Sequence, residues 1–336
     1  MKIEYLTTFK GFDLSERKLP VLIEQAEKPG PIIWLCSAIH GNEITGIEVI
    51  HRIFKFLRRN PLRLGALYAL PAINPSGLEM VKRECPYDNE DINRSFPGNL
   101  YGNTTERLAV VVFNYITNTQ PNLVIDLHCD TFNSVPYAII DRPLNFDPEV
   151  KKTVTKSWNL AEKFGITTTY DIELGGFKKY KLDKSLTAAL LNHRQIPAFT
   201  VELGGPMVIN ESFTRIGVHG IKNILAHFKM IELKKLGWTS ETKIKTLERL
   251  ELIENITCNS SGIIEYLVKP GQFVKKGRTL AKIYNILGQT EEMVLAKQNC
   301  YVISLYDQSI SFPGYTLLSV AAPSREKNET KLKIVN

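Results

Sequence analysis

Two histidines and one glutamate in this sequence have the types and positions of metal ligands. His40 and Glu43 lie three residues apart, where the apolar run 32–36 gives way to a helical pattern. His128 ends a second, mostly apolar run over 123–128, which has the composition of a buried strand. Two imidazole nitrogens and one carboxylate oxygen form the ligand set of catalytic zinc sites, which leave a fourth position to water. These residues therefore predict a zinc site.

Glu202 is the candidate for proton transfer. It ends another apolar run, 198–202, and is followed by Gly204 and Gly205. A carboxylate at a strand end, beside a metal ion, can act as general base toward water. We therefore expect Glu202 to be the catalytic base and not a metal ligand.

The segment from residue 74 to residue 103 holds further polar candidates. It is rich in Pro, Gly, Asn and Asp, and a loop of this length is uncommon in a compact domain unless it is functional. Asn93 and Arg94 offer an amide and a planar guanidinium, the geometry that a substrate carboxylate requires. Alternatively, Arg94 pairs with Asp91 or Glu90 and only holds the loop. Arg83 is a candidate for stabilising an oxyanion.

Alternating strands and helices must position these residues. Up to about residue 236, short apolar runs alternate with helical patterns, which is typical of a mixed or parallel sheet covered by helices. We expect strands over 32–36, 66–70, 123–128 and 198–202, and helices over about 43–58, 105–117, 148–164, 185–194 and 216–236. The candidates then lie at the carboxyl ends of strands, where open α/β sheets bind ligands.

The pattern changes near residue 250. Short apolar runs broken by turns, such as Gly262–Val268 and Leu280–Tyr284, predict a small all-β domain. We therefore expect four parts: a catalytic domain over 1–238, a linker over 239–249, a β domain over 250–327 and a charged tail over 328–336.

Composition excludes several classes of protein. Of the 336 residues, 43% are hydrophobic and 23% are charged, as in ordinary globular proteins. We find no apolar run long enough to span a membrane and no signal peptide, and expect a cytoplasmic protein. The net charge of +7 is spread along the chain without a dense basic stripe, which argues against nucleic-acid binding. The five cysteines contain no CxxC pair, so we expect reduced thiols.

Between about residues 30 and 230 the chain resembles the succinylglutamate desuccinylase/aspartoacylase family of the zinc carboxypeptidase superfamily. Five motifs carry the resemblance, in the family's order: His40–Glu43, Asn74–Pro75, Asp91–Arg94, Asp126–His128 and Val201–Gly205. The resemblance implies an α/β fold with a doubly wound mixed sheet. It also implies roles for seven residues: zinc ligands His40, Glu43 and His128, the base Glu202, the carboxylate-binding pair Asn93 and Arg94, and Arg83, which polarises the scissile carbonyl.

The C-terminal part resembles the biotinyl/lipoyl-type barrel-sandwich domain. A carrier of this type needs an exposed lysine in a tight hairpin, and the corresponding segment, Tyr284–Thr290, contains none. We therefore expect a non-carrier domain that forms a rim or lid on the active site, or an oligomer contact.

Together these observations predict a zinc-dependent hydrolase that cleaves the amide bond of an N-acyl amino acid or a related small N-acyl amine. One zinc ion per chain and a small, carboxylate-bearing substrate are expected, and a homo-oligomer is left open. Two alternatives remain. One is a zinc carboxypeptidase that acts on peptides, and the other is a binding protein that has kept the fold and lost the chemistry.

Overall fold

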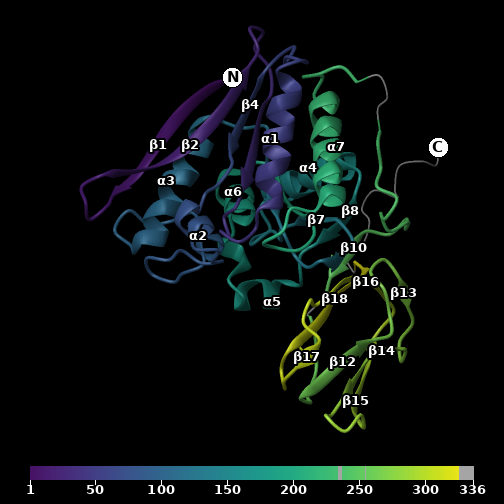
Figure 1. Ribbon diagram of the computed structural model, residues 1–336. Coiled ribbons are helices and arrows are strands. Elements are labelled where there is room, and N and C mark those ends of the chain that lie inside the picture. The colour runs from purple at the N-terminus through teal and green to yellow at the C-terminus, as the bar shows by residue number, and fades with distance from the viewer. Residues whose placement is uncertain (234–236, 254, 325–336) are drawn as a thin grey trace, which may run out of the picture.

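The structure is a computed structural model that describes residues 1–233, 237–253 and 255–324. The tail expected over 328–336 lies outside these ranges. Figure 1 shows a larger α/β part, which includes the N-terminus, and a smaller part built from the C-terminal strands.

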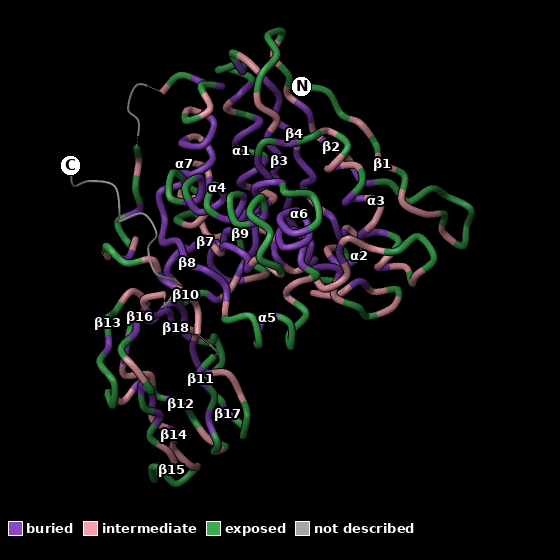
Figure 2. Tube along the Cα trace, turned by 180° about the vertical axis from the view of Figure 1, so that it is seen from behind, coloured by how far each residue is buried: buried purple, intermediate pink, exposed green. Residues whose placement is uncertain are grey.

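Four parallel strands form the centre of the sheet. In spatial order they are β4 (Ala66–Leu70), β3 (Ile32–Ser37), β5 (Leu123–His128) and β9 (Ala198–Glu202). Their residues are nearly all buried, as expected for strands that are covered on both faces (Figure 2). The register pairs His128 with Glu202, so two candidate residues lie side by side at the carboxyl end of the sheet.

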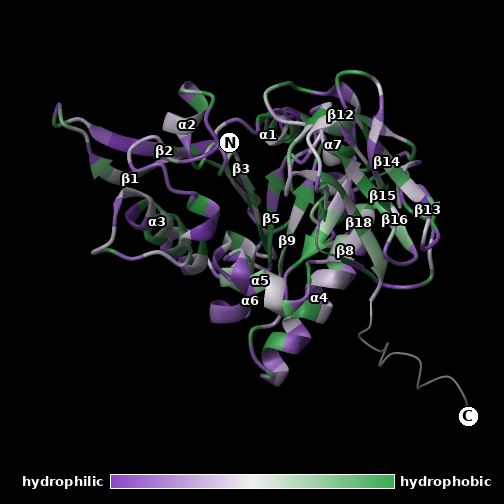
Figure 3. Ribbon diagram, turned by 90° about the horizontal axis from the view of Figure 1, so that it is seen from below, coloured by the Kyte–Doolittle hydropathy of each residue, from purple (hydrophilic) through white to green (hydrophobic). Residues whose placement is uncertain are grey.

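Helices cover both faces of this sheet. On one face, the side chains of Ile33 and Leu35 pack with three helices: α1 (Thr45–Leu57), α4 (Pro148–Phe164) and α7 (Glu211–His227). On the other face, Trp34 and Cys36 pack with α3 (Thr104–Asn118) and α6 (Leu186–Arg194). Because side chains alternate along β3, this strand contributes to two separate apolar cores. Figure 3 shows hydrophobic residues along the central strands.

Most of the predicted elements are confirmed to within one residue at each end, and two helices differ. The helix expected over 43–58 begins only at Thr45, because the N–H of Glu43 closes a turn on the carbonyl of His40 at 3.0 Å. The helix expected over 216–236 was placed wrongly. It begins at Glu211, because the side chain of Asn210 accepts the N–H groups of Ser212 and Phe213 in the first turn, and it ends at His227, shortly before Lys229 with its φ of 59°.

The sequence patterns missed several strands. β1 (Lys2–Lys10) and β2 (Glu16–Gln25) form an antiparallel hairpin beside β4. On the opposite side, β7 (Tyr137–Ile140) runs antiparallel to β9 and parallel to β8 (Thr167–Tyr170), which confirms a mixed sheet. The segment 74–103 is not all loop either, since it contains the short helix α2 (Pro75–Glu79) and the 3-10 helix η1 (Ile92–Arg94).

The large sheet continues into the C-terminal part. β10 (Leu250–Leu252) runs parallel to β8 and pairs with β18 (Thr316–Pro323), which in turn pairs with β16 (Cys300–Leu305). Three short strands join this edge: β11 (Ile256–Thr257) pairs with β18, and both β13 (Phe273–Val274) and β6 (Asn133–Ser134) of the larger part pair with β16. The other C-terminal strands form a second sheet, in the order β15 (Thr290–Leu295), β14 (Thr279–Tyr284), β12 (Gly262–Tyr266) and β17 (Ile310–Ser311).

A shared apolar core lies where the two parts meet. It combines residues of the larger part, such as Val135, with Leu250, Ile303 and Ala321 of the C-terminal strands. Segment 239–249, expected to be a linker, contributes Ile244, whose N–H donates to Thr167 Oγ1 at 3.0 Å. The boundaries at 238 and 249 stay predictions. No described helix has the length and apolar character to cross a membrane.

A chain that ends at Trp238 should aggregate or lose activity. The truncation removes β10 and uncovers both the edge of β8 and the apolar side chain of Val135. Size-exclusion chromatography beside the full-length chain measures this. A truncated chain that keeps the oligomeric state and the activity of the full-length chain would show that the catalytic part does not need the shared core.

Candidate active site

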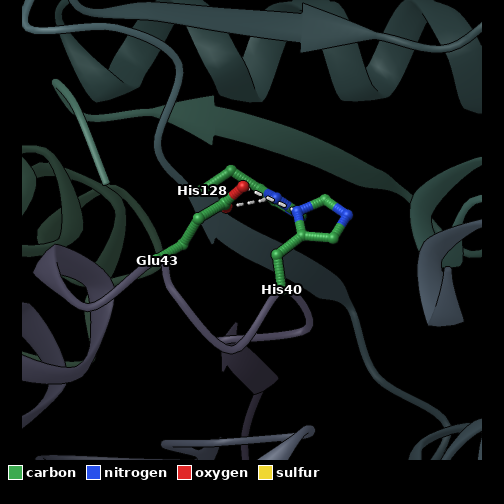
Figure 4. Close-up of side chains that lie close together, drawn as sticks. All are labelled: His40, Glu43 and His128. Atoms are coloured by element: carbon green, nitrogen blue, oxygen red, sulfur yellow. Dashed lines mark hydrogen bonds and ion pairs between the residues drawn. The ribbon is translucent and has the colours of Figure 1, made fainter. Parts of the chain in front are cut away.

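His40, Glu43 and His128 converge at the carboxyl end of the central strands (Figure 4). Nδ1 of His40 lies 2.7 Å from Oε1 of Glu43, and Nδ1 of His128 lies 2.9 Å from Oε2. One ligand atom of each residue lies within 4.8 Å of the other two, and each residue is only 3% exposed. In the part of the chain that the structure describes, no other group of three His, Cys, Asp or Glu residues is spaced in this way.

Local packing fixes the turn that carries two of these residues. His40 and Glu43 lie in the short turn between β3 and α1, and Gly41 stands between them. A Cβ atom on Gly41 would lie 2.1 Å from the backbone carbon of Gly77 in α2, so a side chain here would displace the turn. Asn74 caps the start of α2. Its side chain accepts the N–H of Gly77 and donates to the carbonyl of Glu84 at 3.1 Å.

The remaining imidazole nitrogens have carboxylate partners. Nε2 of His40 lies 3.2 Å from Oδ1 of Asp91, and Nε2 of His128 lies 2.8 Å from Oδ2 of Asp126. When Nε2 donates its proton to a carboxylate, Nδ1 presents a lone pair, which is the usual orientation of a metal-bound histidine. Both Nδ1 atoms then face the same carboxylate, so the donor set fits a divalent cation.

Charge inside the cluster favours such a cation. Burial acts against the charged forms, but the two imidazoles hold the pKa of Glu43 well below its usual value. Likewise, burial lowers the pKa of His128, yet the carboxylates of Asp126 and Glu43 outweigh it and raise this pKa well above its usual value. Protons therefore supply the positive charge that a bound metal would replace, so metal binding here would release protons.

Glu202 lies beside the cluster with one oxygen unused. Its Oε2 atom is buried and has no hydrogen-bond partner among the described residues. Burial raises the pKa of Glu202 to about 8, with His128 lowering it and the carboxylate of Glu43 raising it. A free acceptor atom with a pKa near neutrality is what a general base requires.

Arg83 reaches the same cluster. Its Nη1 donates to Oε1 of Glu43 at 3.3 Å and its Nη2 to Oδ2 of Asp91 at 3.2 Å. Its side chain is 40% exposed, so the guanidinium lies between the buried cluster and solvent. This position suits a residue that contacts a substrate oxygen.

Asn93 and Arg94 lie next to the cluster, on η1. Nδ2 of Asn93 is 3.5 Å from Nε2 of His128, and its Oδ1 accepts the N–H of Leu186 at 2.9 Å. Arg94 donates from Nε to the carbonyl of Tyr180 at 3.0 Å and from Nη1 to that of Asn93 at 2.8 Å. These two carbonyls fix the guanidinium, while His40, Arg83 and the N–H of Asn93 contact Asp91.

Sequence reasoning missed the partners of the ligands. Asp126 appears there only within a motif, although its spacing of two from His128 puts both side chains on one face of the strand. Asp91 appears only within a motif and as an alternative partner of Arg94, not as a partner of His40. Two further buried acids, Asp141 and Asp171, were not considered, because they follow β7 and β8, which the patterns did not reveal.

Known proteins share sequence similarity with most of this chain. A model of the succinylglutamate desuccinylase/aspartoacylase catalytic domain matches residues 29–228. The N-alpha-acetyl-L-2,4-diaminobutyric acid deacetylase of Halomonas elongata is 27% identical over 263 residues, which are 76% of this chain and 71% of that protein.

Solved structures show the same fold. A succinylglutamate desuccinylase/aspartoacylase from Rhodobacter sphaeroides has a TM-score of 0.77 and 21% identity, with 96% of each chain covered. A metallo-carboxypeptidase from Burkholderia cenocepacia has a TM-score of 0.53 and 13% identity, with 68% of this chain and 65% of that chain covered. Since the matched segment 29–228 is more than half of the chain and contains every site residue described above, this chain belongs to the succinylglutamate desuccinylase/aspartoacylase family, whose fold is related to that of metallocarboxypeptidases.

Proposed function

We propose that this chain is a zinc-dependent hydrolase that cleaves the amide bond of an N-acyl amino acid or a related small N-acyl amine. One observation carries the proposal: the Nδ1 atoms of His40 and His128 face the two oxygens of Glu43, and the unpartnered oxygen of Glu202 lies beside them. Membership of a family with a deacetylase relative supports the choice of an acyl amide as substrate.

His40, Glu43 and His128 would hold the zinc ion. Zinc at this site supplies a Lewis acid that polarises a carbonyl and lowers the pKa of water. Asp91 and Asp126 orient the two imidazoles through their Nε2 atoms, so that both Nδ1 lone pairs stay directed at the ion.

Glu202 would move the proton. Its Oε2 accepts a proton from the attacking water and returns it to the amine nitrogen as the amide bond breaks. Because Oε2 has no partner among the described residues, no hydrogen bond must be broken first. A divalent ion held by the neighbouring ligands would lower the pKa of this carboxyl and so favour its basic form.

Arg83, Asn93 and Arg94 would bind the substrate. The guanidinium of Arg83 lies over the cluster, where it can stabilise negative charge on the carbonyl oxygen. Asn93 and Arg94 offer an amide and a guanidinium to the substrate carboxylate, and the fixed guanidinium of Arg94 loses little freedom on binding.

The C-terminal strands would support the loop that follows His128. The N–H of Phe132 donates to both carboxylate oxygens of Asp307, at 2.9 and 3.1 Å, and β6 pairs with β16. This contact favours the rim interpretation of the smaller part. A cytoplasmic location stays a prediction from the sequence.

Asp126→Asn should weaken zinc binding by about 10- to 100-fold, because His128 loses the charged partner that orients its ring. Competition with a chromophoric chelator measures the affinity. The matched control is Asp88→Asn, the same change at a carboxylate that binds Thr105 outside the cluster, and it should leave the affinity unchanged. Equal affinities in all three proteins would separate Asp126 from the metal site.

Glu202→Gln should keep full zinc content and substrate binding while kcat falls on the order of 10²- to 10⁴-fold, since the amide keeps the volume but cannot accept the proton. Elemental analysis and steady-state kinetics with an N-acetyl amino acid measure both. Loss of zinc, or turnover at the wild-type rate, would contradict the role of Glu202 even with the fold correct.

Arg94→Ala should mainly raise KM, because it removes charge-assisted bonds that are equal in the ground and transition states. Arg107→Ala is the matched control, since Arg107 also donates to a backbone carbonyl, that of Gly102, but is an exposed residue of α3. A fall in kcat alone in Arg94→Ala would argue against carboxylate binding by this residue.

A further inference from the structure

Two carboxylates lie side by side beyond the reacting groups. β7 and β8 are parallel and in register, with Ile140 opposite Tyr170, so Asp141 and Asp171 follow them as neighbours. The N–H of Asp171 donates to the carbonyl of Ile140 at 2.9 Å, which continues the pairing to these residues. They are only 4% and 9% exposed.

Asp141 is incompletely partnered. Oδ1 of Asp141 accepts from Ser185 Oγ at 3.3 Å, but its Oδ2 is buried and without a hydrogen-bond partner among the described residues. Oδ1 of Asp171 accepts the N–H of Ile172 at 2.7 Å. A buried carboxylate oxygen without a donor costs free energy unless a ligand or water supplies one.

The charges around Asp141 and Asp171 are compatible with a bound cation. Burial raises the pKa of Asp141 to about 7, and the charge of Asp171 acts in the same direction. Burial raises the pKa of Asp171 to about 6, against the guanidinium groups of Arg142 and Arg94. Arg142 also forms an ion pair with Glu251 at 2.9 Å, so its charge is shared with a third carboxylate.

The pair lies on the same face of the sheet as the reacting groups. Tyr137 is opposite Glu202 and Ile139 is opposite Thr200, so alternation puts Asp141 on the face of Glu202. Three contacts lead back to the metal ligands: Asp141 with Ser185, the next residue Leu186 with Asn93, and Asn93 with His128. Asn93, which is proposed to bind the carboxylate, is thus two contacts from Asp141.

We infer that Asp141 and Asp171 bind an ammonium group on the amine half of the substrate, so that the substrate class is an N-acyl diamino acid with a free carboxylate and a free ammonium. An ammonium offers three donors, which fits an acidic pair with an unused oxygen. Arg94 is held near both acids, and the carboxylate of the same zwitterion would bind there. This inference rests on the proposed function, because it assigns the part of the substrate that the metal does not contact.

The test compares Nα-acetyl-2,4-diaminobutyrate with Nα-acetylnorvaline, which carries a methyl group in place of the ammonium. With zinc-loaded, full-length protein, kcat/KM should favour the cationic substrate by at least about 10-fold. Asp141→Asn should bring this ratio down to about one, a loss of about 10-fold or more. Glu173→Gln is the control, since it neutralises an exposed acid near Asp171 and should leave the rate and the ratio unchanged.

Each outcome has a distinct meaning. Hydrolysis of neither acetyl substrate, nor of other N-acyl amino acids, would overturn the proposed function itself. Equal kcat/KM for the neutral and the cationic substrate, or an unchanged ratio of the two values in Asp141→Asn, would overturn the cation site alone. If Asp141→Asn does not fold, Asp171→Asn replaces it. Calorimetry on the wild-type protein decides independently, because 2,4-diaminobutyrate should bind at least about 10-fold more tightly than norvaline, and equal binding would refute the inference.

Discussion

The two oxygens of Glu43 determine how the site is built. Each faces the Nδ1 atom of a different histidine, at 2.7 and 2.9 Å, and the second oxygen also accepts the N–H of Cys129 at 3.0 Å. One carboxylate therefore joins the turn after β3 to the end of β5. Three buried polar residues in an apolar interior are stable only when they satisfy one another or a cation. The positions of the surrounding carboxylates, Asp91 and Asp126, follow from this requirement.

The register of the sheet places further polar residues on the same face as His128. Because β5 and β9 pair His128 with Glu202, the proposed base lies beside a proposed metal ligand without any loop to place it. The reversal of direction between β9 and β7 then puts Asp141 further along the same face. Groups that would polarise the carbonyl, move the proton and bind the rest of the substrate thus lie along one face of the sheet, with α6 and η1 close to them.

The sequence predicted the elements that carry strong patterns. The central strands are continuous apolar runs, and the residues at their ends were placed correctly because strand ends in an open sheet meet at one edge. Short strands were not predicted. Thr167–Tyr170, for example, is polar in composition and is buried only through its neighbours. For the same reason, Asp141 and Asp171, which follow β7 and β8, were not predicted. The start of α7 could have been found from Asn210, a helix-capping residue.

The central claim is that His40, Glu43 and His128 jointly hold one zinc ion. X-ray absorption spectroscopy of the zinc-loaded, full-length protein tests it most directly, combined with elemental analysis. The account predicts one zinc per chain, with nitrogen and oxygen donors at about 2.0–2.2 Å and no sulfur in the first coordination shell. A sulfur donor would place the metal on a cysteine such as Cys129 and contradict the account, as would a full complement of zinc in His40→Ala or His128→Ala.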